Sequence, residues 1–198
     1  MFAHRGGKPS LILALLLIPQ ALMAEPICDD LWFSRNFYFD RAGFCFSSVL
    51  GEEVFDNADC TTDVPALSID EKAVIADIQA QEGHLGCSTH IQERRELEIT
   101  LLPERRRLLD QPIRSEFESA CVGFLGSELM LFSGRDETGE EIGTIEKGDT
   151  ILLYHAVPNQ KGTRDTFVSG VFRNQEMMPI LGWTNFVLRE EDCAQVAG

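Results

Sequence analysis

The amino-acid sequence predicts an α+β protein with a small disulfide-tied helical N-terminal module and a small C-terminal β-barrel. Three observations lead to this prediction. Apolar residues recur at helical spacing of three and four positions between residues 28 and 87. From residue 121 the period changes to two, in short segments separated by turn residues. Six cysteines in 198 residues favour an oxidising compartment.

Residues 1–24 have the layout of a secretory signal peptide. Arg5 and Lys8 give a positively charged start, an apolar run follows at 11–18, and Ala24 is a small residue suited to signal peptidase. The apolar run is well short of the ~20 residues that span a bilayer. We therefore expect a periplasmic or secreted protein with no membrane insertion after the signal is cleaved.

The charge balance narrows the class of partner. The chain has 17 Lys and Arg against 32 Asp and Glu, a formal net charge of −15. Removal of residues 1–24 leaves 15 basic and 32 acidic residues, a net charge of −17. Nucleic acid and anionic lipid both require a cationic face, so neither is an expected partner. The local exception is an arginine cluster, interpreted as solvated or paired with acidic residues: Arg94, Arg95, Arg105, Arg106 and Arg107.

Residues 25–89 are assigned to the helical module. Asp29 or Asp30 is expected to cap a first helix with an aromatic stripe, and Gly43 is a natural stop after it. A second short helix is expected at 51–57. A third opens at Ser68, where a glutamate three residues later completes a capping box.

The cysteines are expected to form three bridges. If residues 29–41 are helical, Cys28 and Cys45 lie at opposite ends of a rod about 20 Å long, whereas bridged Cα atoms lie within about 7 Å. These two cysteines therefore cannot pair with each other. The proposed pairs are Cys45–Cys60, Cys28–Cys87 and Cys121–Cys193, and the connectivity within the N-terminal module stays open at this point.

Residues 90–119 are interpreted as a connecting segment, because Pro103 and Pro112 interrupt its helical stretches. The barrel is assigned to residues 120–198. Its strands are expected at 129–132, 142–146, 150–157, 166–172 and 182–188.

The string at residues 35–46 resembles the signature of the YARHG domain, an extracellular bacterial module. The residues that fit the motif are Arg35, Asn36, Arg41 and Gly43. Asp40 stands where the family has alanine, and Ala42 stands where it has histidine, so no role of that histidine carries over. The string is also similar to a cysteine-containing relative of that domain, itself of unknown function.

Residues 121–193 resemble a bacterial SH3 domain. The resemblance rests on an isoleucine-glycine pair followed by a lysine-glycine pair within residues 141–150, and on the Gly-Trp-Thr string that starts at Gly182. The family's further Trp-containing strand is replaced by Asp165–Val168. The resemblance implies an SH3-like small β-barrel and binding to peptidoglycan peptides, although a fold of this kind supports many functions.

Two sets of residues are candidates for ligand binding. The first is a polar group on the first helix, which either binds a ligand or holds the following turn: Arg35, Asn36, Asp40 and Arg41. The second is an aromatic set that could line a shallow groove for a peptide or glycan stem: Tyr154, Phe167 and Trp183. Core packing is an equal alternative for Phe167.

From the sequence we expect no bound metal, no cofactor and no enzymatic activity. A spacing that suits metal binding is found for three residues of metal-binding types, His84, Cys87 and His90. In an exported protein, however, Cys87 is better suited to a disulfide bridge than to a thiolate ligand. Cysteine catalysis would need a free thiol, and six cysteines can all pair. We expect a non-catalytic envelope protein that binds peptidoglycan or an envelope partner. The alternative is a structural or inhibitory interaction module acting through its acidic surface.

Overall fold

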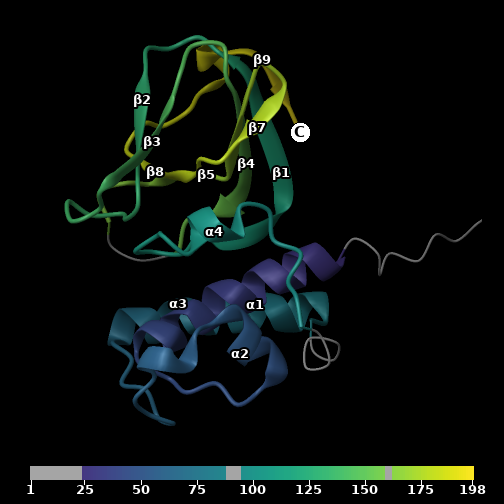
Figure 1. The fold of residues 1–198 in the computed structure, drawn as a ribbon. Coiled ribbons are helices and arrows are strands. Elements are labelled where there is room, and N and C mark those ends of the chain that lie inside the picture. Colours follow the sequence, from purple (N-terminus) through teal and green to yellow (C-terminus); the bar gives the residue numbers. More distant parts are fainter. Residues whose placement is uncertain (1–23, 88–94, 159–161) are drawn as a thin grey trace, which may run out of the picture.

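A computed structural model describes residues 24–87, 95–158 and 162–198, and it shows a layer of helices beneath two β-sheets (Figure 1). The predicted signal peptide, apart from its last residue, lies outside the described residues, and so do Arg94 and His90. Within the described ranges, no helix has both the length and the apolarity needed to cross a membrane.

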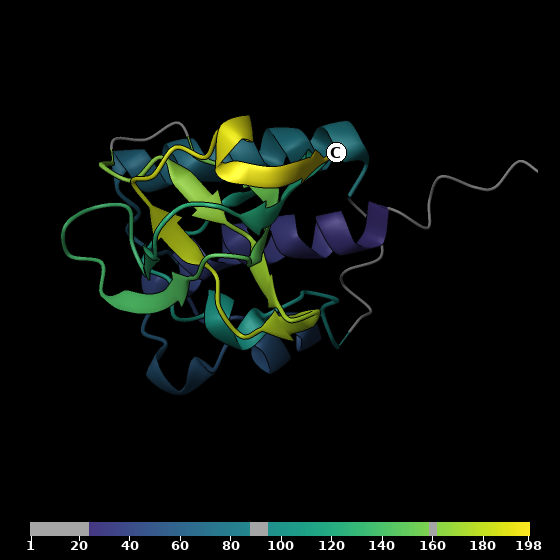
Figure 2. The same ribbon diagram turned by 90° about the horizontal axis from the view of Figure 1, so that it is seen from above.

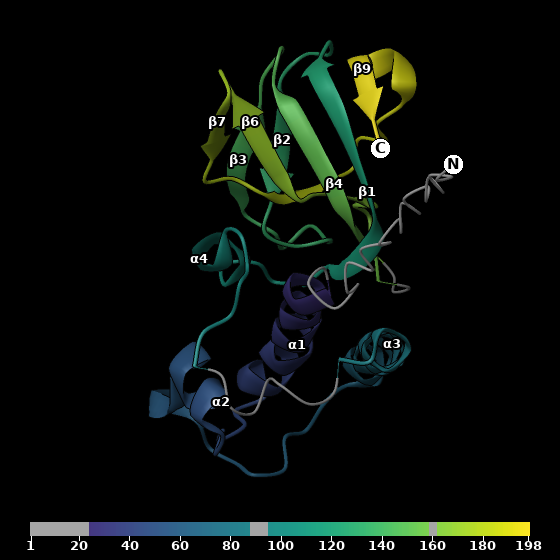
Figure 3. The ribbon, with the colours of Figure 1, turned by 90° about the vertical axis from the view of Figure 1, so that its right-hand side faces the viewer.

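Three helices form the helical module, defined here as residues 24–87: α1 (Ala24–Arg41), α2 (Val49–Val54) and α3 (Ile69–Leu85). Helix α1 begins five residues before the predicted cap, so Asp29 and Asp30 are not capping residues but lie buried within the helix. Helix α3 begins as predicted, because Ser68 and Glu71 form a capping box. Figure 3 shows α1 between the other two helices, beneath the ends of β1 and β4.

Helix α1 is buried on two faces, which explains its dense aromatic content. One face packs against α2 and its flanking loops, where Phe33 stacks on Phe55 at 5.6 Å and Phe55 stacks on Phe46 at 4.9 Å between ring centroids. The other face, with Leu31 and Tyr38, packs against the apolar side of α3. Two faces that bury apolar surface make α1 the central element of the module.

All three predicted disulfides are present. Cys28–Cys87 joins the start of α1 to the end of α3, with Cα atoms 5.4 Å apart. Cys45–Cys60 and Cys121–Cys193 have Cα separations of 4.9 and 5.2 Å. Cys87 is therefore not available as a thiolate ligand beside His84.

The sheet module, defined here as residues 113–198, contains two antiparallel sheets. The five-stranded sheet has the order β7-β6-β4-β1-β9, and the four-stranded sheet has the order β3-β2-β8-β5. The strands are β1 (Ile113–Phe124), β2 (Leu129–Phe132), β3 (Glu141–Ile145), β4 (Thr150–Ala156), β5 (Thr166–Val168), β6 (Gly170–Arg173), β7 (Glu176–Met178), β8 (Gly182–Thr184) and β9 (Cys193–Ala197).

The two sheets correct the prediction of a small closed barrel. Among the described strands, no backbone pairing joins one sheet to the other, and they pack face to face as in a sandwich. The strand expected at 166–172 is broken at Ser169, so that its first part joins the four-stranded sheet and its second part the five-stranded sheet. The core between the sheets contains Phe124, Leu131, Ile145, Ile151, Val168 and Val171.

The connecting segment, defined here as residues 95–112, lies at the junction of the two modules. Its short helix α4 (Leu102–Arg105) sits between the helical layer and the sheets, as Figures 1 and 3 show. Figure 2 shows from above that the sheets lie over the helices. The expected helical stretches beyond residue 105 are replaced by an irregular run that leads into β1 at Ile113, seven residues before the expected start of the barrel. The junction is where the chain brings charged groups of both modules together.

Candidate functional site

A buried ion pair joins α1 to the connecting segment. Arg105, at the end of α4, is 1% exposed. Its Nη1 donates to both carboxylate oxygens of Asp30 at 3.0 and 2.9 Å, and its Nη2 donates to Ser34 Oγ at 2.8 Å. Its Nε donates to Gln111 Oε1 at 2.9 Å. These bonds hold Arg105 in one orientation, as a buried guanidinium requires.

His155 on β4 extends this network into the sheet module. Its Nε2 lies 2.8 Å from Arg105 Nη1, and its Nδ1 lies 2.9 Å from Ser169 Oγ. Nε2 also lies 3.1 Å from Asp30 Oδ2. Because the contact to Arg105 is shorter and a guanidinium nitrogen can only donate, we assign Nε2 as the acceptor and the ring proton to Nδ1, which donates to Ser169. The network therefore contains a neutral histidine between a charged pair and a serine.

The environment fixes the charges of the network. Burial alone would raise the pKa of Asp30, but the charge and hydrogen bonds of Arg105, together with the contact to His155, outweigh it and hold that pKa well below its ordinary value. Burial lowers the pKa of His155 to about 4; Asp30 opposes this effect and Arg105 adds to it. At neutral pH Asp30 is thus ionised and His155 is uncharged.

Asp30, His155 and Ser169 are the residue types of a hydrolytic triad, but their geometry is not that of one. A triad needs a serine that is free to attack a bound substrate. Ser169 is 1% exposed, and its Oγ accepts the backbone N–H of Tyr154 at 3.0 Å. The histidine nitrogen nearest Asp30 is also bonded to Arg105. These contacts favour a structural role, in which the three residues fix the two modules against each other.

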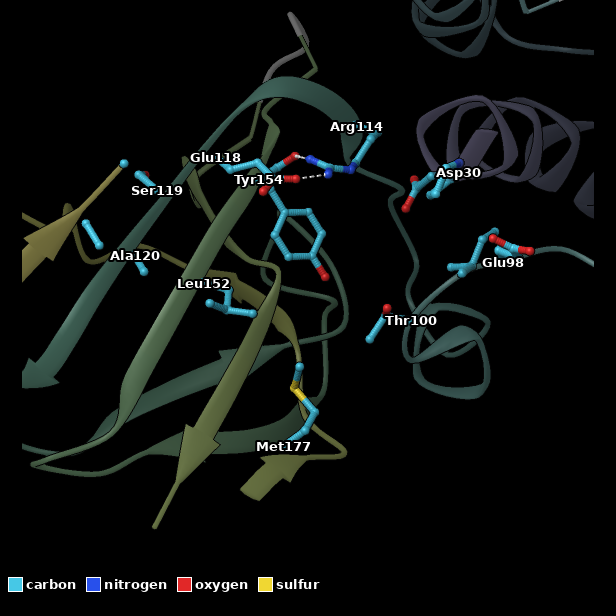
Figure 4. A pocket seen from close by; sticks show the side chains of 14 residues that line it. Asp30, Glu98, Thr100, Arg114, Glu118, Ser119, Ala120, Leu152, Tyr154 and Met177 are labelled. Atoms are coloured by element: carbon cyan, nitrogen blue, oxygen red, sulfur yellow. Dashed lines mark hydrogen bonds and ion pairs between the residues drawn. The ribbon is translucent and has the colours of Figure 1, made fainter. Parts of the chain in front are cut away.

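A pocket of about 520 Å³ opens beside this network, between the two modules. Figure 4 shows Asp30, Glu98 and Thr100 on the side of α1 and the connecting segment, facing Leu152, Tyr154 and Met177 on the outer face of the five-stranded sheet. The volume lies within the range of ligand pockets, about 300–1,000 Å³. The pocket therefore has the size of a ligand site and walls from both modules.

Tyr154 and Arg114 give the sheet side of the pocket a fixed shape. The Arg114 guanidinium lies over the Tyr154 ring at 4.4 Å and donates to the backbone oxygens of Ser115 and Tyr154 at 2.8 and 2.7 Å. The Tyr154 hydroxyl donates to Ser169 O at 3.1 Å. Burial and the charge of Asp30 raise the pKa of Tyr154, so the hydroxyl stays protonated. These bonds hold both side chains in place without a ligand.

Comparison with protein families assigns both halves of the chain. Residues 86–198 match a domain of unknown function, DUF4453. The chain belongs to the DUF4453 family. Residues 10–83 match the YARHG domain, as the motif predicted. No curated protein and no solved structure matches the chain. The disulfides and the YARHG match together indicate a protein that works outside the cytoplasm.

The DUF4453 match includes the connecting segment together with the sheet module. The ion network therefore joins the two matched regions: Asp30 and Ser34 belong to the YARHG match, and Arg105 and His155 belong to the DUF4453 match. The pocket has walls from both matches as well.

Three polar residues of the YARHG motif hold the fold together. Arg35 pairs with Glu82 of α3 at 2.9 Å. Asn36 is buried and donates to Trp32 O at 2.8 Å. Arg41 lies over the Phe37 ring at 4.4 Å and donates to backbone oxygens of the connecting segment. The three side chains point to different neighbours, which favours the structural interpretation of this group.

Asp40 lines a smaller pocket of about 240 Å³ together with Arg41, Asp56 and Asp59. Burial and the charge of Asp59 raise the pKa of Asp40. The structure therefore brings two of the four polar candidates of α1, Asp40 and Arg41, to one pocket, whereas Arg35 and Asn36 do not line it.

Two of the three aromatic candidates in the DUF4453 region lie in the core. Phe167 and Trp183 are 2% and 0% exposed, because these paired residues of β5 and β8 pack in a buried cluster with Leu108 of the connecting segment and with Leu181. Their rings meet at 4.8 Å, and Trp183 Nε1 donates to Asp110 O at 2.9 Å. The expected groove of Tyr154, Phe167 and Trp183 is therefore not formed, and Tyr154 instead lines the pocket between the modules.

Proposed function

We propose that this protein is a non-catalytic binding protein of the bacterial envelope, periplasmic or secreted, and that its ligand site is the pocket between the helical and sheet modules. The observation that carries the proposal is the composition of the walls: Asp30 and Thr100 come from one side of the module boundary, and Leu152 and Tyr154 come from the other. Module boundaries are preferred places for ligand sites.

The buried network supports the proposal because it holds the pocket walls before a ligand arrives. Asp30 takes part in both the network and the pocket. Tyr154 is fixed by Ser169, which also receives the bond from His155. A preformed site avoids the entropic cost of ordering its walls on binding.

The chemistry of the pocket suits a peptide. The sheet side offers half-buried apolar surface from Leu152 and Met177, and the opposite side offers polar groups of Glu98 and Thr100. A peptide stem of peptidoglycan, or an extended segment of an envelope protein, combines apolar and polar groups at this scale. An SH3-like relationship of residues 121–193 remains part of the proposal and agrees with a peptide ligand.

The alternative function is binding of a basic partner protein through the acidic surface. Phe117 on β1 is 85% exposed and stands between Glu116 and Glu118, which favours a contact of this kind. Binding through exposed charges weakens steeply as salt rises, whereas binding in the pocket depends less on salt.

A pocket-filling substitution tests the main proposal. Thr100 is exposed at the pocket, so Thr100→Trp adds bulk there without disturbing the core. We expect the wild type to sediment with purified peptidoglycan sacculi or to bind a protein from an envelope extract, and Thr100→Trp to weaken that binding about tenfold, about 1.4 kcal/mol.

Val187→Trp is the matched control. Val187 is 64% exposed and does not line this pocket, so the same side chain is added at a distant surface position. Wild-type binding by Val187→Trp is expected. Equal binding by Thr100→Trp and the wild type would place the ligand site elsewhere.

A further inference from the structure

The cationic groups around the pocket between the modules are already bonded within the protein. Arg105 is enclosed by Asp30, Ser34 and Gln111 and is 1% exposed. Arg114 donates to two backbone oxygens, pairs with Glu118, and has a side chain that is 11% exposed. Neither guanidinium is directed at a ligand.

Carboxylates, by contrast, remain available at the pocket. Glu98 is exposed, and the described residues supply no ion-pair partner for its carboxylate. Figure 4 shows it at the side of the pocket opposite Tyr154. Glu118 also lines the pocket, and its side chain is 66% exposed although it contacts Arg114. The charged groups left for a ligand are therefore acceptors of hydrogen bonds rather than donors.

Apolar surface lies next to these carboxylates. Leu152 and Met177 are half-buried on the outer face of the five-stranded sheet, where β4 and β7 expose them to the pocket. A Cβ placed on the neighbouring Gly170 would meet both side chains at 3.5 Å, so the three positions form one continuous patch. A ligand that fills the pocket thus meets apolar atoms on one side and carboxylates on the other.

We infer that the ligand of this pocket is a peptide that carries a side-chain ammonium, with the ammonium directed toward Glu98 and the aliphatic part of that side chain against Leu152 and Met177. The inference rests on the proposed function, which it makes more specific. A lysine-like side chain combines an apolar stem with a charged end, and this combination matches the two sides of the pocket.

Three capped tripeptides that differ in one side-chain end test the inference: acetyl-Ala-Lys-Ala-amide, the same peptide with norleucine, and the same peptide with glutamate. Their binding is followed by the amide NMR shifts of Glu98, Thr100, Leu152 and Tyr154 in the intact protein at low salt. The lysine peptide is expected to bind at least about threefold more tightly than the norleucine peptide, and the glutamate peptide is expected to bind most weakly.

Glu98→Gln and Glu137→Gln form the matched pair of variants. Both remove one negative charge from an exposed position, but Glu137 does not line this pocket. Glu98→Gln is expected to weaken the lysine peptide about three- to fivefold, as for an exposed ion pair, and to leave the norleucine peptide unchanged. Glu137→Gln is expected to change neither affinity.

The outcomes separate this inference from the proposed function. If all three peptides shift the pocket amides with equal affinity, or if the two variants behave alike, the ligand is not selected by its ammonium although the pocket still binds peptides. If no peptide shifts the pocket amides, the ammonium inference is overturned, and the Thr100→Trp experiment decides whether the pocket is a binding site.

Discussion

Asp30 is the residue through which the two modules are most directly joined. Its carboxylate, 8% exposed, accepts two hydrogen bonds from Arg105 and lies 3.1 Å from His155 Nε2. A buried ion pair adds little net stability compared with apolar packing, but removal of one partner leaves the other charge uncompensated. The cost of losing Asp30 is therefore mainly the cost of isolating Arg105.

Replacement of this carboxylate is expected to destabilise the protein strongly. Asp30→Asn keeps the shape of the side chain but leaves the Arg105 guanidinium buried without a counter-charge. We expect the free energy of unfolding to fall by about 3–5 kcal/mol, measured by urea denaturation at pH 7.

Glu82→Gln is the control for that substitution. It breaks the ion pair between Arg35 and Glu82. Their side chains are 21% and 14% exposed, respectively, so solvent reaches the pair. We expect a loss of about 1 kcal/mol or less. Equal losses of unfolding free energy in the two variants would show that burial of the Asp30–Arg105 pair does not raise the cost of breaking it.

The buried network was not predicted from the sequence, and of its residues only Asp30 and Arg105 carry a sequence-based expectation. The sequence offers Asp29 or Asp30 as a helix cap and predicts that Arg105 is solvated or paired with an acidic residue, without naming the partner. Asp30 and Arg105 are separated by 75 positions, and His155 lies 125 positions from Asp30. Burial of a charge depends on how distant elements pack, which no local pattern records. One signal was present: Asp30 and Ser34 are one helical turn apart, where an aspartate and a serine can share a buried partner.

Helix α3 shows what local signals can predict at the scale of one element. Its capping box was predicted because the pattern involves four consecutive residues and needs no distant partner. The helix ends at Gly86, with φ of +70°. The break of the strand at Ser169, in contrast, could not be predicted, because it depends on which sheet each half of the strand joins.

Two glycines of α3 are expected to respond in opposite directions to the same substitution. Gly83 is helical and Gly86 is left-handed, and a Cβ would meet nothing within 4 Å at either position. Gly83→Ala is expected to raise the free energy of unfolding by about 0.5 kcal/mol, since alanine loses less backbone entropy. Gly86→Ala is expected to lower it by about 1 kcal/mol.

Thermal and urea unfolding of both variants measures this difference, and each serves as the control for the other. Because neither added methyl group makes a contact, a change of the same sign in both variants would mean that backbone conformation does not set the outcome.

At the scale of the whole molecule, the network makes stability depend on pH. The pKa of His155 is about 4 in the folded protein, below its ordinary value of 6.5. As the pH falls from about 6.5 to 4, the unfolded chain binds a proton that the folded chain does not, so the free energy of unfolding falls, by up to about 3 kcal/mol. Asp30, whose pKa is also lowered, adds a further loss only below about pH 4.

Urea unfolding at pH 7, 5.5 and 4.5 measures this dependence. His155→Gln removes the titrating ring and is expected to flatten the dependence over that interval. His84→Gln is the control, because the His84 side chain is 75% exposed. A wild-type stability that does not change between pH 7 and 4.5 would contradict the assignment of His155 as buried and neutral.

The position of Cys28 near the start of α1 and of Cys45 just after its end bears on how the chain is oxidised. These are consecutive cysteines in the sequence, yet the native bridges nest Cys45–Cys60 inside Cys28–Cys87. Pairing in order of appearance would join Cys28 to Cys45. Once α1 has formed, its rise of about 1.5 Å per residue holds these two thiols too far apart to react. Early folding of α1 thus prevents the mispairing of Cys28 with Cys45, and a variant that delays this helix would depend on a disulfide isomerase.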